Sequence, residues 1–254
     1  MRARIAAAVR ACSLATLVIA AVALASPAAA QTGVPRTADG HPDLQGIWQA
    51  LNTAVWNLED HAGELGVPAS QSVVQGGEIP YLPSALARRE ENYRNRRTED
   101  PEAKCQMVGV PRITYLPHPF QIMQTPKQLT ILYEYAHVFR NIYLNSQHPK
   151  GSLEWWMGDS RARWEGDTLV VDVIHFNDRT WLDRSGNYHS SALHVVERYT
   201  RTGPDHMRYE ATIEDAKTFS RPWTISMPLY RRQETNARLL EYECYAYLET
   251  ERDK

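Results

Sequence analysis

The chain is predicted to be an all-β protein whose main part is a closed, antiparallel, up-and-down barrel. Short runs rich in Val, Ile, Tyr and Thr recur from residue 121 onward, separated by turn residues. Several runs alternate apolar and polar residues, as strands with one wet face do. Strands do not alternate with helices, so a parallel sheet is not expected. A strongly bent sheet or a β-sandwich is the alternative architecture.

The first 30 residues are predicted to be a secretory signal peptide and not part of the fold. Three arginines precede an apolar run, residues 11–25, that is too short and too rich in Ala for a comfortable membrane span. Residues 28–30 are all Ala, which suits cleavage after residue 30. We therefore expect a periplasmic or secreted protein with no membrane span in the mature chain.

Composition limits the partners and the domain organisation. Removing residues 1–30 removes three arginines and no acid, so the formal net charge falls from −2 to −5. A mildly acidic chain without basic clusters argues against nucleic acid as a partner. The length suits one domain with an extension. We expect an N-terminal extension at residues 31–120 that wraps a barrel domain at residues 121–254; nothing indicates the oligomeric state.

The extension is expected to contain one strand, one helix and much loop. Residues 46–48, Gly-Ile-Trp, start the first strand. Residues 52–77 show no sustained period and are predicted to be loop. Residues 85–97 combine helix formers with many charges, which predicts an exposed helix capped by Ser84. Three prolines within residues 105–119 predict an extended segment that crosses the surface.

The barrel domain is predicted strand by strand. Gly166 and Asp167 lie between two strand patterns and predict a hairpin. The predicted strands are residues 121–124, 128–135, 138–144, 160–164, 168–176, 194–201, 207–213, 223–230 and 239–248.

Two cysteines follow the signal peptide. In an oxidising compartment Cys105 and Cys244 are expected to form a disulfide that ties the extension to the last strand. Two buried free thiols are the alternative. A catalytic thiolate is not favoured, because neither cysteine has a neighbouring His.

A barrel of about eight strands can hold one small ligand. The strands carry many aromatic residues, which suit an amphipathic pocket, although a core simply filled by aromatics explains them equally well. The residues predicted to contact the ligand are Trp181, Asn177, Tyr133, Tyr209 and Arg198.

The densest group of reactive side chains lies between residues 163 and 198. His189 and His194 can approach each other if the chain turns between them, and Asp183 would orient one of them for acid–base chemistry. Glu134 alternates with apolar neighbours, so it is expected to face inward, with a raised pKa, as a reserve proton carrier. We expect no cofactor.

Other polar residues of this stretch favour structural roles. His175 continues the apolar face of residues 169–173 and is interpreted as a core residue. Asp172, on the opposite face, is interpreted as a buried carboxylate paired with Arg161 or Arg198. His189, His194 and Glu197 match no strong metal signature, so no metal site is predicted.

Four segments resemble a family of exported bacterial proteins of largely uncharacterised function. They are WEGDTLVVD, FNDRTWLD, HSSALHVVER and RPWTISMPL, with Cys105 and Cys244 at the ends of the matching region. The overlap covers over half of the mature chain and implies export, but no activity. Gly-Ile-Trp and the number of strands also resemble lipocalin-like barrels.

These observations support an exported protein with a pocket for a small, partly apolar molecule. One hypothesis is a cofactor-free acid–base enzyme: a lyase, an isomerase or a hydrolase. A second is a lipocalin-like binder without catalysis, and a third is a structural or interaction protein of the cell envelope.

Overall fold

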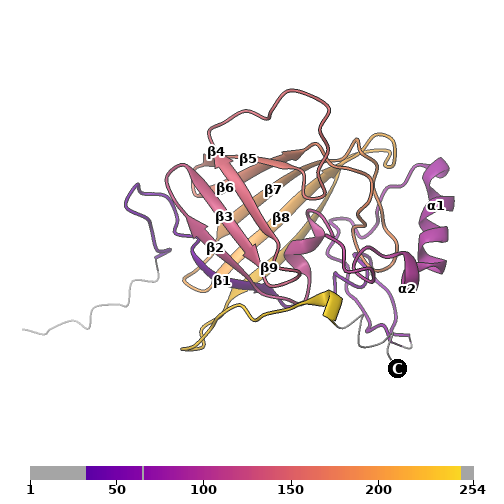
Figure 1. The fold of residues 1–254 in the computed structure, drawn as a ribbon, viewed down its shortest axis with the longest axis horizontal. Coiled ribbons are helices and arrows are strands. Elements are labelled where there is room, and N and C mark those ends of the chain that lie inside the picture. The colour runs from indigo at the N-terminus through magenta and orange to yellow at the C-terminus, as the bar shows by residue number, and fades with distance from the viewer. Residues whose placement is uncertain (1–32, 65, 247–254) are drawn as a thin grey trace, which may run out of the picture. The chain divides into compact units, whose positions relative to one another are not determined.

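The computed structural model describes residues 33–64 and 66–246, so the predicted signal peptide lies outside the described residues. Nine strands in the described part of the chain form a closed barrel (Figure 1). The strands are β1 Gly46–Ala50, β2 Phe120–Gln124, β3 Gln128–Tyr133, β4 Phe139–Leu144, β5 Asp159–Glu165, β6 Thr168–Ile174, β7 His194–Arg201, β8 His206–Glu214 and β9 Trp223–Arg231.

Strands that follow one another in the sequence are neighbours in the sheet, and β1 pairs with β9 to close it. The predicted barrel is thus confirmed. One pair departs from the antiparallel expectation: β4 and β5 run parallel, with Ile142 opposite Ser160. Parallel neighbours need a crossover connection. Residues 145–158 supply it as the long loop that rises above the barrel in Figure 1.

The alternating sequence pattern explains which side chains fill the barrel. On β8 and β9, buried residues alternate with more exposed ones, as predicted. The inward-facing members are Met207, Tyr209, Ala211 and Ile213 on β8, and Trp223, Ile225, Met227 and Leu229 on β9. The hairpin also forms as predicted, with Glu165 opposite Thr168 and Gly166 at a positive φ of 58°.

A buried ion pair spans the barrel interior between β4 and β7. The Arg140 guanidinium donates to both Glu197 carboxylate oxygens, and its Nε donates to the Ser160 hydroxyl over 2.9 Å. The Tyr199 and Tyr209 hydroxyls donate to Glu197 over 3.0 and 2.8 Å. Hydrogen bonds from several partners offset the cost of removing both charges from water.

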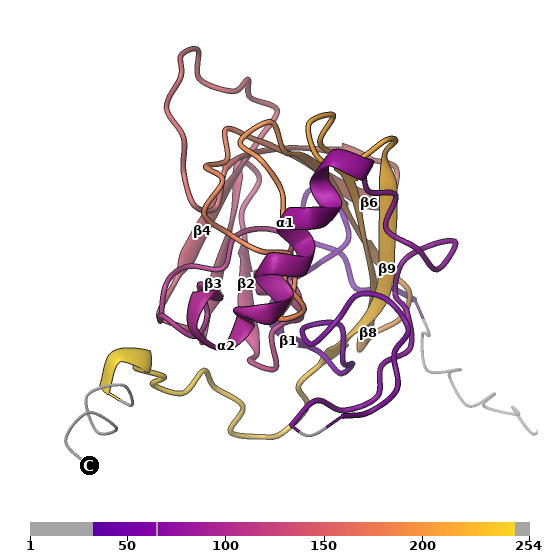
Figure 2. The same cartoon turned by 90° about the vertical axis from the view of Figure 1, so that its right-hand side faces the viewer.

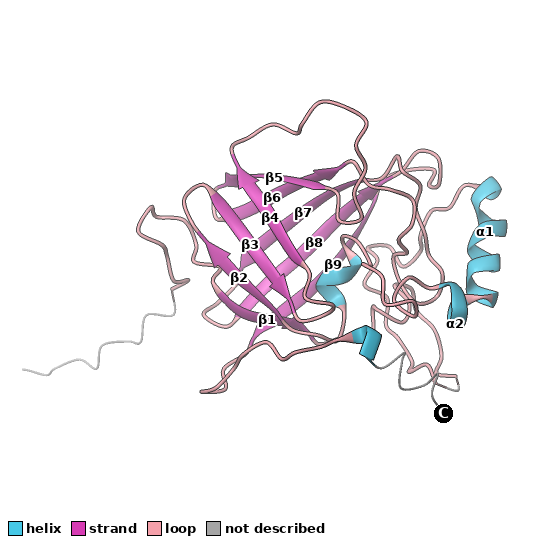
Figure 3. Ribbon diagram, in the orientation of Figure 1, coloured by secondary structure: helices cyan, strands magenta, loops and turns pink. Residues whose placement is uncertain are grey.

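The helices belong to the extension and lie outside the barrel (Figure 3). α1 spans Pro83–Arg94 and α2 spans Arg96–Glu99, so the predicted helix exists but breaks at Asn95. The predicted cap is wrong: Leu82 precedes the helix, and Ser84 lies within its first turn. Proline at the first helical position lacks an N–H that would need capping.

The prediction that residues 105–119 cross the surface is wrong. Residues Arg112–Tyr115 form a 3-10 helix, η1, whose four side chains are all buried. Figure 3 shows η1 between the barrel and α1. The Tyr115 hydroxyl donates to the Leu182 carbonyl over 2.6 Å, which fixes η1 to the loop after β6. The prolines stiffen this segment as predicted, but the segment covers the end of the barrel.

The predicted strand at residues 239–248 is wrong for the described residues. Tyr242 makes one isolated bridge with Tyr135, and a helical turn begins at Cys244; residues 247 and 248 lie outside the described part. The pairing of β9 with β1 leaves no free sheet edge for another strand. The predicted cysteine pair is present, since Cys105 and Cys244 form a disulfide with Cα atoms 5.5 Å apart, but Cys244 lies in the helical turn and not in a last strand.

Replacing both cysteines with serine should reduce the free energy of unfolding by about 2–4 kcal/mol, because the disulfide closes a long loop; its cysteines are 139 residues apart. Urea unfolding of the wild type, with and without reductant, and of the double variant measures this difference. Mass spectrometry provides the control. Two free thiols in protein produced in an oxidising compartment would contradict the prediction.

Glu197→Ala should destabilise the protein by about 3–5 kcal/mol, because it leaves the Arg140 guanidinium buried without a counter-charge. The matched control is Glu165→Ala, which breaks a solvent-exposed ion pair with Arg198 and should leave the urea midpoint almost unchanged. If Glu197→Ala and Glu165→Ala shift the urea midpoint equally, the interior ion pair contributes no more to stability than the exposed one.

Candidate ligand cavity at the end of the barrel

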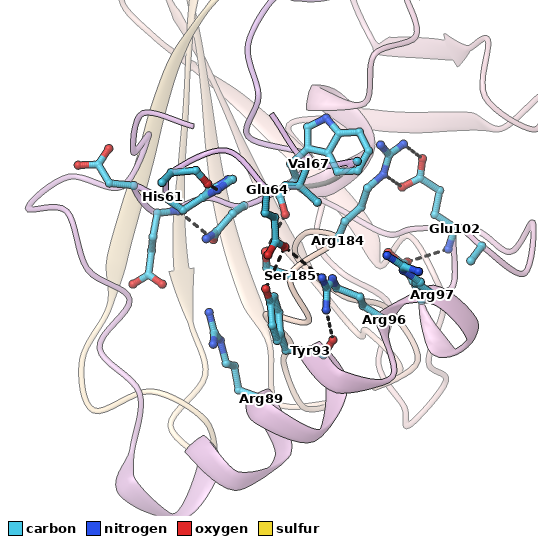
Figure 4. Close-up of a pocket in the computed structure, with 18 of the residues that line it drawn as sticks. His61, Glu64, Val67, Arg89, Tyr93, Arg96, Arg97, Glu102, Arg184 and Ser185 are labelled. Atoms are coloured by element: carbon cyan, nitrogen blue, oxygen red, sulfur yellow. Dashed lines mark hydrogen bonds and ion pairs between the residues drawn. The ribbon is translucent and has the colours of Figure 1, made fainter. Parts of the chain in front are cut away.

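A cavity of about 740 Å³ lies outside the barrel interior, between loop 56–67, the two helices and the loop that carries Arg184 and Ser185. We call it the arginine cavity. Figure 2 shows α1 lying across the barrel end that faces the viewer, and Figure 4 shows the residues around the cavity. This volume falls within the range typical of small-molecule sites. The sequence predicted a pocket inside the barrel, whereas this cavity lies against the extension.

The lining of the arginine cavity includes apolar and aromatic side chains. Trp56, Val67, Tyr93 and Tyr242 all line the cavity. The Arg184 guanidinium lies 4.3 Å from the centre of the Trp56 ring. Cation–π contact of this kind holds the indole in place, which leaves a preformed apolar surface for part of a ligand.

The acidic residues of the cavity are already engaged within the protein. Glu64 accepts hydrogen bonds from the Tyr93 hydroxyl and from Arg96, each over 3.0 Å (Figure 4). Glu102 is held by Arg184 and Arg112. Burial raises the pKa of Glu102, but the two arginines outweigh burial and lower it overall. The remaining acids accept backbone or arginine donors: Glu59 from Ile79, Asp60 from Ser72 and Asp100 from Arg112.

Two of the arginines in the lining have no carboxylate partner among the described residues. Arg89, on α1, reaches only Asn187, through Nε at 3.5 Å, and its guanidinium lies 5.7 Å from the Tyr93 ring. In Figure 4 its side chain extends from α1 toward the loop that carries His61. Arg97, on α2, is exposed. Arg89 and Arg97 therefore offer positive charge to a ligand, while Glu59 and Asp60, held only by backbone N–H donors, keep their negative charge.

His61 is a potential proton acceptor in the cavity lining. Its Nδ1 lies 2.8 Å from the Ala62 carbonyl oxygen, which makes Nδ1 the protonated nitrogen. Its Nε2 is buried and has no hydrogen-bond partner among the described residues. A proton transfer from a bound molecule to this lone pair requires the lining around His61 to move, because Nε2 is shielded from the cavity.

Asp183, predicted to be catalytic, is a structural residue at this end of the barrel. It is fully buried and accepts N–H bonds from Leu58, Ser185 and Asn187, the last through both backbone and side chain. Burial raises the pKa of Asp183 to about 6, against the opposing effect of these donors. The carboxylate holds loop 183–187 against residue 58 and so shapes the cavity without lining it.

The two predicted catalytic histidines lie in different surroundings. His189 is buried; its Nδ1 donates to the Ser190 carbonyl over 2.9 Å, and the Thr180 hydroxyl donates to its Nε2 over 2.6 Å. His194 lies on the outer face of β7, where its Nε2 is 3.0 Å from Asp172. The expected partners of Asp172 were Arg161 or Arg198, so that pairing is wrong.

Glu134 lies under the C-terminal segment and not inside the barrel. It accepts the Leu240 N–H over 2.7 Å and lies 3.5 Å from His118 Nδ1. Among the described contacts, no hydrogen bond or ion pair joins any two of Asp183, His189, His194 and Glu134.

The residues predicted to bind a ligand are scattered as well. Tyr133 and Tyr209 belong to the barrel core, Trp181 packs beneath α1 with Ala85, and Arg198 pairs with Glu165 on the outer surface. Asn177 caps its own loop by accepting the Arg179 N–H.

The assignment of His175 to the core is also wrong. β6 ends at Ile174, and the positive φ of 64° at His175 breaks the alternation. Phe176 takes the buried position instead.

No group of three or more His, Cys, Asp and Glu side chains within the described ranges is placed to hold a metal ion. Comparison with protein-family models, with curated proteins and with solved structures found no match. His61 and Arg89 were not predicted from the sequence, because one lies in an aperiodic loop and the other in a helix whose charges are typical of a solvated face.

Removing the His189 imidazole should make folding less sensitive to acid. Burial lowers the pKa of His189, so on acidification the unfolded chain binds a proton before the folded chain does. The stability linked to this group is complete above its unfolded pKa of about 6.5 and is lost as the pH falls toward the folded-state pKa. Urea unfolding between about pH 7 and 5 should show a smaller loss of stability in His189→Gln. If variant and wild type lose equal stability on acidification, the link between the lowered pKa of His189 and acid sensitivity is contradicted.

Proposed function

We propose that this chain is an exported protein that binds a small, partly apolar molecule carrying an anionic group. The arginine cavity is the proposed site. The observation that supports the proposal most directly is the combination of aromatic lining residues with two arginines, Arg89 and Arg97, that have no carboxylate partner among the described residues.

The anionic group of the proposed ligand would bind Arg89 and Arg97, the two lining arginines without a carboxylate partner among the described residues. The attraction between an unpaired guanidinium and an anion is stronger beside a low-dielectric aromatic surface than in bulk water. At Glu64 and Glu102 a cationic ligand would have to displace arginines, whereas at Glu59 and Asp60 the carboxylates accept only backbone N–H donors. The apolar part of the ligand would pack on Trp56 and Val67 and contribute roughly 25 cal/mol for each Å² of apolar surface buried.

Export is part of the proposal. Residues 1–30 have the pattern of a signal peptide, and the Cys105–Cys244 disulfide suits an oxidising compartment. The resemblance to exported bacterial proteins agrees with this location. Within the described ranges, no helix has the length and apolar character needed to cross a membrane.

Acid–base catalysis in the same cavity is the second candidate, and the unpartnered Nε2 of His61 favours it. His61 would accept a proton from the bound molecule, as a cofactor-free lyase, isomerase or hydrolase requires. The catalytic roles assigned from the sequence to Asp183, His189, His194 and Glu134 stay predictions. Slow conversion of a bound carboxylate by wild type, but not by His61→Gln, would support the catalytic candidate in NMR time courses.

Binding is tested by calorimetric titration with cinnamate and decanoate, and with their uncharged amides. The carboxylates should bind with a Kd of about 1 mM or tighter. The amides should have a Kd that is higher by about tenfold or more. Arg89→Ala should weaken carboxylate binding by about tenfold or more, because it removes a charged hydrogen-bond donor.

Arg94→Ala is the matched control for Arg89→Ala. Arg94 is exposed on the same helix and does not line the cavity, so binding should be unchanged. The proposal fails if neither carboxylate binds at up to about 10 mM, or if the two arginine variants weaken binding equally.

A further inference from the structure

A second cavity, also of about 740 Å³, lies along the other face of the helices. We call it the tryptophan groove. Its lining shares no residue with that of the arginine cavity. Neighbouring positions of α1 point to different cavities: Arg88 lines the tryptophan groove and Arg89 the arginine cavity. The opposite wall of the groove comes from the loops that carry Trp156 and Trp181.

The charges of this groove balance. Arg88, Lys104 and Arg179 are matched by three acids, Glu91, Glu99 and Asp178. Lys104 and Glu99 already pair with each other over 2.6 Å. No excess of either sign is left in this groove to attract an ion.

Hydrogen-bonding capacity in the groove is largely unused within the protein. The side chains of Glu91, Asn95, Gln106 and Asp178 form no hydrogen bond or ion pair in the part of the chain that the structure describes. The Arg179 guanidinium forms no hydrogen bond or ion pair with the described residues, and it lies 5.9 Å from the centre of the Trp156 ring. These groups are planar and carry paired donors or acceptors, which can each engage two neighbouring hydroxyl groups.

The tryptophans supply the complementary apolar surface. Trp156 is partly exposed, whereas Trp181 is 7% exposed, so Trp156 offers the wider face. An indole is a large, rigid surface with a polar N–H at one edge. It suits a ligand that has one apolar face and a polar rim.

We propose that the tryptophan groove binds a neutral oligosaccharide of two or three rings. A pyranose ring presents C–H groups on its face and hydroxyl groups around its edge. The face would stack on Trp156, and the hydroxyl groups would bond the unused planar side chains. The balanced charge favours uncharged sugars over uronic acids or sugar phosphates. The groove volume lies within the range of small-ligand sites.

The proposal is tested by calorimetric titration with cellotriose, maltotriose and the N-acetylglucosamine trimer. At least one should bind with a Kd of about 1 mM or tighter. Trp156→Ala and Asp178→Ala should each weaken that binding by about fivefold or more. Asp178 is exposed and unpaired in the described structure, so its replacement leaves the fold intact even if the tryptophan variant unfolds.

Trp155→Ala is the matched control, since Trp155 is the neighbouring exposed indole and does not line the groove. It should bind the trisaccharide as wild type does. The proposal is overturned if none of the three sugars binds at up to about 10 mM, or if Trp155→Ala weakens binding as much as Trp156→Ala. Arg89→Ala should leave sugar binding unchanged, so failure here is distinct from failure at the arginine cavity.

Discussion

The fully buried guanidinium of Arg112 determines how the extension covers the end of the barrel. It donates to both carboxylate oxygens of Asp100, over 2.7 and 2.8 Å, and to Glu102 over 2.6 Å. A cation removed from water must be paired, or its burial costs several kcal/mol. Because Glu102 also binds Arg184, the same network joins the end of α2, η1 and the loop after β6. Burial opposes the charge, yet the carboxylates raise the pKa of Arg112 above its ordinary value.

This arrangement places α1 across the barrel end (Figure 2), and residues of the helix line two separate cavities. Only Ala85 of that helix is buried, so most of its side chains are free to line the two cavities. The charge pattern predicted a helix face in contact with solvent. A helix face that lines a binding site is also in contact with solvent until a ligand binds. The sequence distinguishes exposed from buried helices, but it does not distinguish free solvent from a concave wall. That wall forms only when loop 56–67 and the loops carrying Trp156 and Arg184 fold around the helix.

The strands of the barrel were predictable because alternation is a local signal tied directly to burial on one face. The same signal failed at residues 239–248, where the alternating pattern exists but the sheet has no edge left to pair with. It also failed at His175, where a positive φ turns the backbone out of the strand. Positions of loops relative to one another depend on distant pairings such as Arg112 with Asp100. No periodicity of the sequence encodes those pairings, so the cavities could not be predicted.

The density of polar residues between Asn177 and Glu197 now has a structural reason. A loop packed against the barrel end must satisfy its own backbone groups, because buried N–H and C=O groups without partners are costly. Asp183, with its several N–H donors, and His189, with a hydroxyl and a carbonyl, meet that requirement. Polar side chains whose bonds are all made within the protein have little left to offer a ligand. The arginines of α1 and the planar groups beside Trp156 keep that capacity, so binding is better inferred from unsatisfied polar groups than from their number.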